Sequence, residues 1–352
     1  RMKSDTPKVL HKISGKPMLY YSIKEALKLS DDITVVLFHQ AQRVQAEMEK
    51  YFSNINFVIQ DHENYPGTGG AVMGIKPKYE EVLVLNGDMP LIQAEELKKF
   101  DAFVCGSDQI WNTTARDFSE AFFLPGISKK STYAVSCGSH LNEVDCDRIC
   151  SAMETFENVS VREIDTREFL EKHTKRSIET VLDPAFLLTK EDYSGLYDKE
   201  RILKEKYIFL YTINYDEDAL KQTVRVAERL GGCKIVTPFT GYSAIKAKKY
   251  GIKVMWDVAP DAFLNLIENA ECVCSNSFHG IAFSIIFKKE FYRVGAMDQT
   301  GKIKKDDRID NILNWCGLSN RNYGETNGNR KIDYIQVEHT LNTLRNRSNQ
   351  YI

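Results

Sequence analysis

Polar side chains stand directly after several short apolar runs of this sequence, where a strand would end. His279 follows "ECVCS" and precedes "GIAFSIIF", and Arg162 lies at the end of "VSVRE". Asp108 comes just after "DAFVCG", and Asp88 just after "EVLVLN". In parallel α/β sheets, ligands bind beyond the carboxyl ends of the strands, where loops and helix N-termini meet. These four residues are therefore the first candidates for chemistry, together with Asp183 and Asn214, which also follow apolar runs.

His279 has the side chain best suited to give up a proton near neutral pH. It stands between a predicted strand and a predicted helix, and Gly280 after it permits a close approach. We predict that His279 is a general acid. The alternative is a capping or core histidine bonded to the backbone.

Two arginines are candidate anion contacts. In one interpretation, the guanidinium of Arg162 binds the carboxylate or phosphate of a ligand through two parallel hydrogen bonds. In the other it forms an ion pair with Glu163 or a nearby Asp. Arg308 is a further candidate for an anion contact, and Asp183-Pro184 predicts a turn.

The stretch "GSDQIWN" places polar and aromatic residues together after a strand: Asp108, Gln109, Trp111 and Asn112. The ring of Trp111 offers a flat face to a sugar, and Asp108 could deprotonate a sugar hydroxyl. The alternative is that Trp111 belongs to the core and that Asp108 caps a turn.

The elements that must position these residues follow from the apolar periodicity. Buried strands are predicted over 33–38, 55–60, 81–86, 101–106, 132–137, 159–163, 206–213, 233–238, 253–256 and 271–275. Amphipathic stretches such as "AQRVQAEMEKYF", "DEDALKQTVRVAERLGG" and "PDAFLNLIENA" lie between strands, and a helix closes the chain. Strands alternating with helices predict an α/β fold with Rossmann-like parallel sheets.

Composition narrows the class of protein. The formal net charge of −2 provides no basic field that would attract nucleic acid. The sequence has no run of about 18 apolar residues, and "RMKSDTPK" carries no apolar signal, so we expect a cytoplasmic protein with at most peripheral membrane contact. The first residue is Arg1 rather than Met, which suggests an excised fragment. The eight cysteines show no Cys-x-x-Cys pair and are expected to be buried free thiols.

Residues 1–100 contain "RMKSDTPKVLHKISGKPML", "IQDHENYPGTGGAV" and "VLVLNGDMPL" in this order. This segment resembles part of the nucleotidyltransferase domain of the bifunctional enzyme that makes UDP-N-acetylglucosamine. The resemblance implies a partial Rossmann-like segment in which Asp88 holds Mg²⁺ by a hard carboxylate oxygen. It also implies that UTP is bound by Arg1, Lys8, Gln60, Gly67 and Thr68.

From residue 101 the motifs change to "DAFVCGSDQIWN", "YAVSCGS", "VSVREIDT", "LDPAFLL", "APDAFLNLIENAECVCSNSFHGIAFSIIF" and "DRIDNILNWCGL". This part resembles the polysaccharide pyruvyl transferase family, with a match from about 101 to 320. The resemblance implies a two-lobed, glycosyltransferase-B-like fold over 101–352, with lobes at 101–200 and 201–352. Some members carry an Arg two residues before the His, where this chain has Ser277; we still count Ser277 among the candidate substrate contacts.

The family resemblance implies transfer of the enolpyruvyl unit of phosphoenolpyruvate onto hydroxyls of a nucleotide- or lipid-linked sugar in cell-surface polysaccharide synthesis. Such a reaction requires no cofactor, because the donor carries its own leaving phosphate. A second hypothesis is uridylyl transfer to a sugar 1-phosphate by residues 1–100, with Mg²⁺. A third is a folded but inactive chimera of two fragments.

Overall fold

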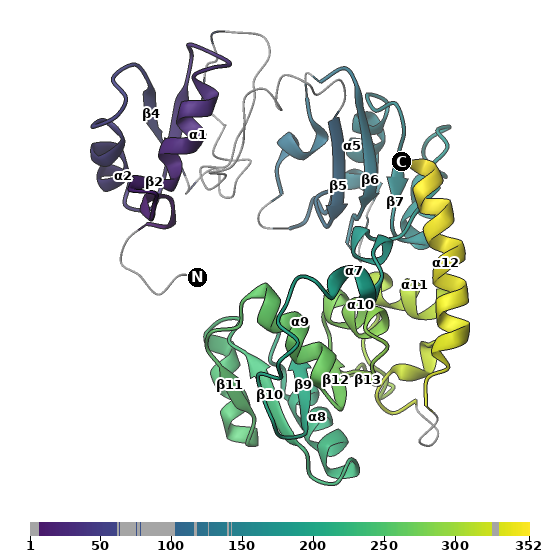
Figure 1. The fold of residues 1–352 in the computed structure, drawn as a ribbon. Helices are drawn as coiled ribbons and strands as arrows, with labels where there is room; N and C mark the ends of the chain where they lie inside the picture. Colours follow the sequence, from purple (N-terminus) through teal and green to yellow (C-terminus); the bar gives the residue numbers. More distant parts are fainter. Residues whose placement is uncertain are drawn as a thin grey trace. The chain divides into compact units, whose positions relative to one another are not determined.

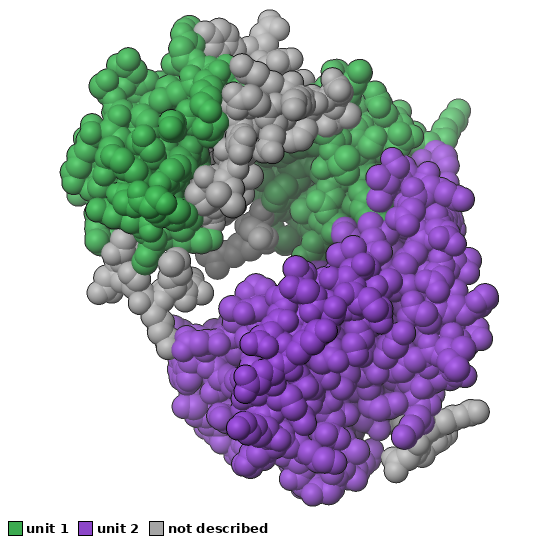
Figure 2. Space-filling view, in the orientation of Figure 1, with its two compact units in different colours: residues 1–137, 141–159, 173–176 green, residues 138–140, 160–172, 177–352 purple. Residues whose placement is uncertain are grey.

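The computed structural model describes most of the chain, namely residues 7–61, 63, 75, 78, 103–115, 118–125, 127–138, 141, 143–325 and 331–352. These residues form two compact units (Figure 2). Unit 1 holds 1–137, 141–159 and 173–176, and unit 2 holds 138–140, 160–172 and 177–352. Among the described residues, no helix combines the length and the apolar character that a membrane crossing needs.

The first part of unit 1 is a small α/β segment (Figure 1). Its paired elements are the short antiparallel strands β1 (Lys12–Ile13) and β2 (Lys16–Pro17) and the parallel strands β3 (Thr34–Leu37) and β4 (Asn56–Ile59). Its helices are η1 (Lys8–Leu10), α1 (Met18–Ala26) and α2 (Ala41–Met48). One apolar cluster holds them, formed by Leu10, Leu19, Ile23, Leu37, Val44 and Met48.

The second part of unit 1 is built on two parallel strands. Strand β5 (Phe103–Asp108) pairs with β6 (Lys130–Val135), so that Asp108 lies opposite Val135. The remaining elements are η2 (Glu120–Phe123) and α5 (Glu143–Met153).

A five-stranded parallel sheet forms the centre of unit 2, in the order β11-β10-β9-β12-β13. The strands are β9 (Tyr207–Tyr211), β10 (Lys234–Pro238), β11 (Lys253–Met255), β12 (Cys272–Ser275) and β13 (Phe291–Arg293). Because successive side chains of a strand point to opposite faces, β9 sends Tyr207 and Phe209 into one apolar cluster and Ile208 and Leu210 into another. The sheet is therefore buried on both faces, as parallel sheets usually are.

The helices of unit 2 begin where the sequence signals predict. Asp216 caps α8 (Glu217–Arg229) by accepting a hydrogen bond from Ala219, and Pro260 occupies the first turn of α9 (Pro260–Asn269). The other long helices are α10 (Phe278–Ile286), α11 (Asp307–Trp315) and α12 (Tyr334–Tyr351). The shorter elements of this unit are β7 (Ser160–Val161), α6 (Ile164–Leu170), β8 (Glu179–Thr180), η3 (Pro184–Leu187), α7 (Lys190–Tyr193), η4 (Tyr242–Tyr250) and η5 (Ser319–Arg321).

The expected α/β class with parallel sheets is confirmed by the paired strands. The expected lobe boundary at residue 200 differs from the observed division, because residues before and after it share one core. Leu182, Phe186 and Tyr193 lie in the same apolar cluster as Tyr207 and Phe209. A boundary there would expose this cluster to water.

Candidate functional site

His279 lies in the first turn of α10, directly beyond the carboxyl end of β12. Ser277 is the residue that precedes the helix, and its backbone N–H donates to Ser275 Oγ at 3.0 Å. The side chain of His279 is 41% exposed, whereas that of Ser277 is buried. The predicted position of the histidine at the carboxyl edge of a parallel sheet is thus confirmed, and its imidazole is accessible to a ligand.

Asp183 faces this histidine from the segment between β8 and η3. Its Oδ1 lies 3.9 Å from His279 Nε2 and also accepts a hydrogen bond from Ala185 N at 3.0 Å. Asp183 thereby caps η3, as the expected Asp-Pro turn requires, while its side chain is only 3% exposed. A buried carboxylate and an accessible imidazole therefore meet at one point of unit 2.

Arg162 completes this cluster as its buried cation. Its Nη1 donates to Asp183 Oδ2 at 2.7 Å and its Nε donates to Glu163 Oε1 at 2.9 Å. Its guanidinium lies over the ring of Phe278, 4.4 Å from the centroid. The ion-pair alternative for Arg162 is therefore what the structure shows, and it involves both Glu163 and a nearby Asp. An anionic ligand would have to share this guanidinium with two carboxylates.

A small, open hollow lies beside this cluster. It is lined by Arg162, Leu182, Asp183, Phe186, Phe278, Arg308, Ile312 and Trp315. The two arginines approach it from different elements, since Arg162 follows β7 and Arg308 lies in α11. The structure thus brings together both arginines that the sequence singled out.

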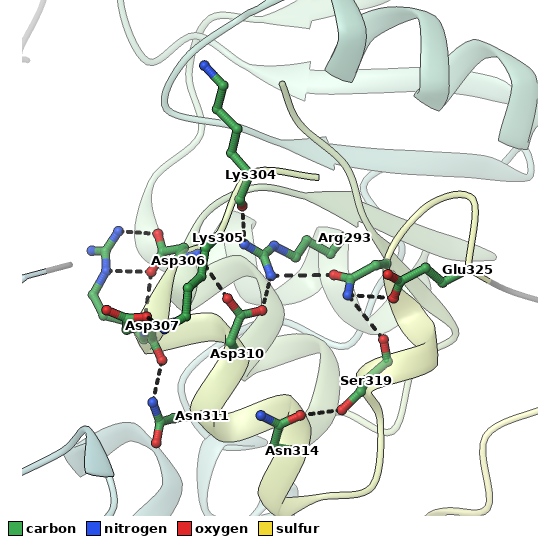
Figure 3. A network of polar contacts seen from close by, with 12 residues as sticks. Arg293, Lys304, Lys305, Asp306, Asp307, Asp310, Asn311, Asn314, Ser319 and Glu325 are labelled. Carbon is green, nitrogen blue, oxygen red and sulfur yellow. Dashed lines mark hydrogen bonds and ion pairs between the residues drawn. The ribbon is translucent and has the colours of Figure 1, made fainter. Parts of the chain in front are cut away.

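Arg308 is held in place at the start of α11. Its Nε and Nη2 donate to the two carboxylate oxygens of Asp306, at 3.0 and 2.6 Å. Asp306 in turn donates its backbone N–H to Asp310 Oδ2 at 2.9 Å, and the buried Arg293 of β13 forms an ion pair with Asp310 (Figure 3). Burial raises the pKa of Asp306, but the hydrogen bonds and charge of Arg308 outweigh it and hold that pKa below its usual value.

Gly280 permits a close approach, as expected, but the atoms that approach it belong to the protein and not to a ligand. A Cβ atom at this position would lie 2.1 Å from Ser275 Oγ and 2.9 Å from Tyr211 Cδ1. Ser275 Oγ is fixed there because it donates to the carbonyl of Tyr211 at 2.6 Å. The glycine therefore lets α10 pack against β12 and β9, and it sets the height of His279 above the sheet.

The residues of "GSDQIWN" lie in unit 1, after β5. Asp108 is exposed and its φ of 57° is left-handed, a conformation that is uncommon for a residue other than glycine. Gln109 and Asn112 bond to each other, since Asn112 Nδ2 donates to Gln109 Oε1 at 3.1 Å. Asn112 Oδ1 also accepts from Thr114 Oγ1 at 2.7 Å, so these amides shape the turn that presents Asp108.

The proposed sugar-stacking role of Trp111 is wrong, and the core alternative holds. Its side chain is 0% exposed, and its ring meets the edges of Phe123 and Phe156 at centroid distances of 5.5 and 5.6 Å. Its indole N–H donates to the carbonyl of Phe122 at 3.4 Å. A ring enclosed in this way has no face to offer to a sugar.

Two of the expected nucleotide contacts fall on described residues. Lys8 is exposed in η1, and Gln60 directly follows β4, where its N–H donates to the carbonyl of Leu37 at 2.8 Å. Arg1, Gly67, Thr68 and Asp88 lie outside the described residues. In the part of the chain that the structure describes, no group of three His, Cys, Asp or Glu side chains is arranged to hold a metal ion.

The cysteines are free thiols, as expected. Seven of them are buried, and Cys233 is partly exposed. Cys146 and Cys150 lie one turn apart in α5 with their sulfur atoms 3.8 Å apart. Burial raises the pKa of Cys105, of Cys146 and of Cys316 to about 12 in each case.

The position of Asp183 after an apolar run placed it among the candidates at the carboxyl edge of a sheet. The role predicted for it was a turn, and its pairing with His279 was missed. The motif "LDPAFLL" could not identify His279 as the partner, because residues 183 and 279 are far apart in the sequence and come close only in the folded chain.

Comparison with known proteins gives two separate matches. A family model described as polysaccharide pyruvyl transferase matches residues 19–296. The match begins well before residue 101, where the motifs placed its start. It ends at 296 rather than near 320.

The second match is to a different kind of protein. The bifunctional protein GlmU of Aliarcobacter butzleri is 88% identical over 101 residues, which are 29% of this chain and 23% of that protein. The bifunctional protein GlmU of Wolinella succinogenes is 70% identical over 100 residues, 28% of this chain and 23% of that protein. The chain therefore spans less than a quarter of the length of these curated relatives.

Among solved structures, the complex of MnaA from S. aureus with UDP aligns with 91% of this chain and 89% of its own, at 12% identity and a TM-score of 0.44. The UDP-GlcNAc 2-epimerase from Methanocaldococcus jannaschii aligns with 90% of this chain and 93% of its own, at 13% identity and a TM-score of 0.41.

Proposed function

This chain belongs to the polysaccharide pyruvyl transferase family, and we propose that it converts the enolpyruvyl group of phosphoenolpyruvate into a pyruvate ketal on hydroxyls of a nucleotide- or lipid-linked sugar. The observation that supports this proposal is the accessible imidazole of His279 beside a buried Asp183–Arg162 pair. We place the reaction in the cytoplasm, in the synthesis of cell-surface polysaccharide, with no cofactor.

The reaction needs an acid. Protonation of the methylene carbon of phosphoenolpyruvate makes it a methyl group and leaves an oxocarbenium-like centre at the neighbouring carbon. Two sugar hydroxyls add to that centre in turn while the bond to phosphate breaks. Of the two hydroxyl protons, one replaces the proton given to the methyl group and the other leaves with phosphate.

His279 is the proposed proton donor. Its Nε2 lies 3.9 Å from Asp183 Oδ1, so a carboxylate stands beside the proposed proton donor. Asp183 is in turn oriented by Arg162 and by the N–H of Ala185, which leaves it little freedom to turn away. Arg162, Arg308 and Ser277 are the proposed contacts of the carboxylate and phosphate of the donor.

The acceptor is proposed to approach the exposed carboxylate of Asp108, which removes a hydroxyl proton. Gln109 and Asn112 form the turn beside it and supply amide groups for hydrogen bonds to the sugar. An Asp108→Asn protein that keeps the fold but loses sugar-dependent turnover would support this role. Unchanged turnover in that protein would remove it.

The test of the proposal is release of phosphate from phosphoenolpyruvate in the presence of a panel of UDP-linked and lipid-linked sugars. Sugar-dependent release is expected for the intact chain, and a loss of at least about 100-fold for His279→Gln, the usual scale for a general acid. The matched control is His339→Gln, because His339 is exposed on α12. No release above background from folded protein would overturn the proposal.

A second candidate function is supported by the 88% identity to a GlmU protein over 101 residues. It is uridylyl transfer from UTP to a sugar 1-phosphate, with Asp88 holding Mg²⁺. A rise in melting temperature with UTP that requires Mg²⁺ and disappears in Asp88→Asn would support this pocket. A rise with phosphoenolpyruvate alone would support the first proposal, and a rise with neither would support an inactive chimera.

A further inference from the structure

The closing helix α12 forms two hydrogen bonds with the backbone of the segment that carries Asp183. Ser348 Oγ accepts a hydrogen bond from the backbone N–H of Leu182 at 2.9 Å, and Arg345 Nε donates to the carbonyl of Phe186 at 2.7 Å. Both side chains are buried, with Ser348 at 1% and Arg345 at 6% exposure. Asp183 lies between the two bonded residues, one residue after the first and three residues before the second.

Arg345 is itself fixed within α12. Its Nη1 donates to Glu338 Oε1 at 2.6 Å and to Asn342 Oδ1 at 2.8 Å. These contacts orient the guanidinium so that Nε points at the carbonyl of Phe186. A buried arginine with three such hydrogen bonds has little freedom of rotation, and the carbonyl that it binds is held with it.

The same helix contacts the last turn of α10, which carries His279, and the two lysines just after that helix. The hydroxyl of Tyr334, at the start of α12, donates to the carbonyl of Ser284 at 3.4 Å and also bonds to the carbonyl of Lys289. Glu338 pairs with Lys288 at 3.5 Å. One rigid helix therefore bonds, at its two ends, to the element that carries the imidazole and to the segment that carries the carboxylate.

We propose that α12 is a positioning element for this site, in which Ser348 and Arg345 are positioning residues that set the distance between Asp183 and His279. The inference rests on the proposed function for its catalytic consequence. Ser348→Ala removes the oxygen that accepts the N–H of Leu182, so the segment that carries Asp183 is less firmly tied to α12 and is expected to shift. A shift on the scale of 1 Å at a reacting group can lower a rate by about 100-fold.

The contact between Asp183 and His279 can be measured by NMR, with no need for enzymatic activity. We would label the histidines of the intact chain with ¹³C and ¹⁵N and record the imidazole resonances of its seven histidines. His279→Gln identifies the signal of His279, and Asp183→Asn shows how that signal changes when the carboxylate is lost.

Ser348→Ala is expected to move the His279 signal in the same direction as Asp183→Asn. The matched control is Thr343→Ala, because Thr343 lies exposed on the same helix and its hydroxyl donates to the carbonyl of His339 within that helix. If Ser348→Ala does not fold, Arg345→Lys replaces it, since lysine keeps the charge but lacks the fork that reaches Phe186 and Glu338 together. A His279 signal that stays at its original position in a folded variant would overturn the inference.

The kinetic readout separates positioning from plain stabilisation. Ser348→Ala is expected to lower kcat by about ten-fold at nearly constant KM for phosphoenolpyruvate, with Thr343→Ala unchanged. A variant that only melts earlier, with kcat preserved, would show a structural role and overturn the inference. If the unmodified chain releases no phosphate, the proposed function fails, and the His279 signal still decides whether α12 positions Asp183.

Discussion

Asp183 Oδ1 lies 3.9 Å from His279 Nε2, while the other oxygen of the same carboxylate holds Arg162 at 2.7 Å. One buried carboxylate therefore serves a fixed cation and an accessible imidazole. Asp183 thus contacts a residue of the protein interior and a residue of the site surface, because Arg162 is buried and His279 is not. Substitutions of Arg162 should therefore lower stability in addition to any effect on donor binding, and substitutions at His279 should act mainly on turnover.

Loss of Arg162 should be strongly destabilising. Arg162→Ala leaves the carboxylates of Glu163 and Asp183 buried without their cation, and breaking a buried pair in this way costs about 3–5 kcal/mol. Urea unfolding followed by circular dichroism measures the effect. The control is Lys234→Ala, which breaks an exposed pair with Glu205 and should have a far smaller effect, because solvent screens that pair. Equal effects of the two substitutions would contradict the prediction.

A methyl group at Gly280 should push α10 away from the sheet. Gly280→Ala places a carbon against Ser275 Oγ, and overpacking of this kind costs about 1–3 kcal/mol. The expected result is a lower free energy of unfolding together with reduced turnover, since His279 moves with the helix.

Removing the side chain of Ser275 should restore part of the stability that Gly280→Ala loses. The double substitution Gly280→Ala with Ser275→Gly is expected to be more stable than the sum of the two single changes, because the clashing side chain is gone. Gly195→Ala is the control, since nothing lies within 4 Å of its added carbon. Simple additivity in the cycle would show that the contact does not govern the packing.

The thiols should differ sharply in reactivity towards a disulfide reagent at pH 8. Because the thiolate is the reacting form, a thiol whose pKa is raised to about 12 stays protonated and inert at this pH. We expect about one equivalent to react in the folded chain, at the partly exposed Cys233, and eight in denaturant. Cys233→Ser should remove the fast equivalent, and several fast thiols in the folded chain would contradict the burial.

Trp111 should act on stability rather than on sugar binding. Trp111→Ala removes a fully buried ring and is expected to cost about 3–5 kcal/mol. Trp256→Ala should cost clearly less, because that ring is 47% exposed. Thermal unfolding of both variants makes the comparison, and a fully stable Trp111→Ala protein would reopen the question of its role.

The strands of unit 2 could be predicted closely, because buried parallel strands leave an apolar run that local sequence displays. The predicted strands at 206–213 and 271–275 enclose β9 and β12. β13 was not predicted, since Phe291–Arg293 is too short to show a period and forms only by pairing with β12. The position of His279 beyond β12 followed from the same local pattern.

The sequence by itself determined the α/β class, the order of the elements and the chemical types of the site residues, because apolar periodicity and turn signals are local. Only the tertiary structure decided which groups meet. Arg162 pairs with Asp183 across 21 positions, and Ser348 reaches Leu182 across 166. It likewise decided that Trp111 is enclosed by Phe123 and Phe156 rather than open to a ligand. Burial and pairing depend on packing between distant segments, and no local pattern of residues encodes them.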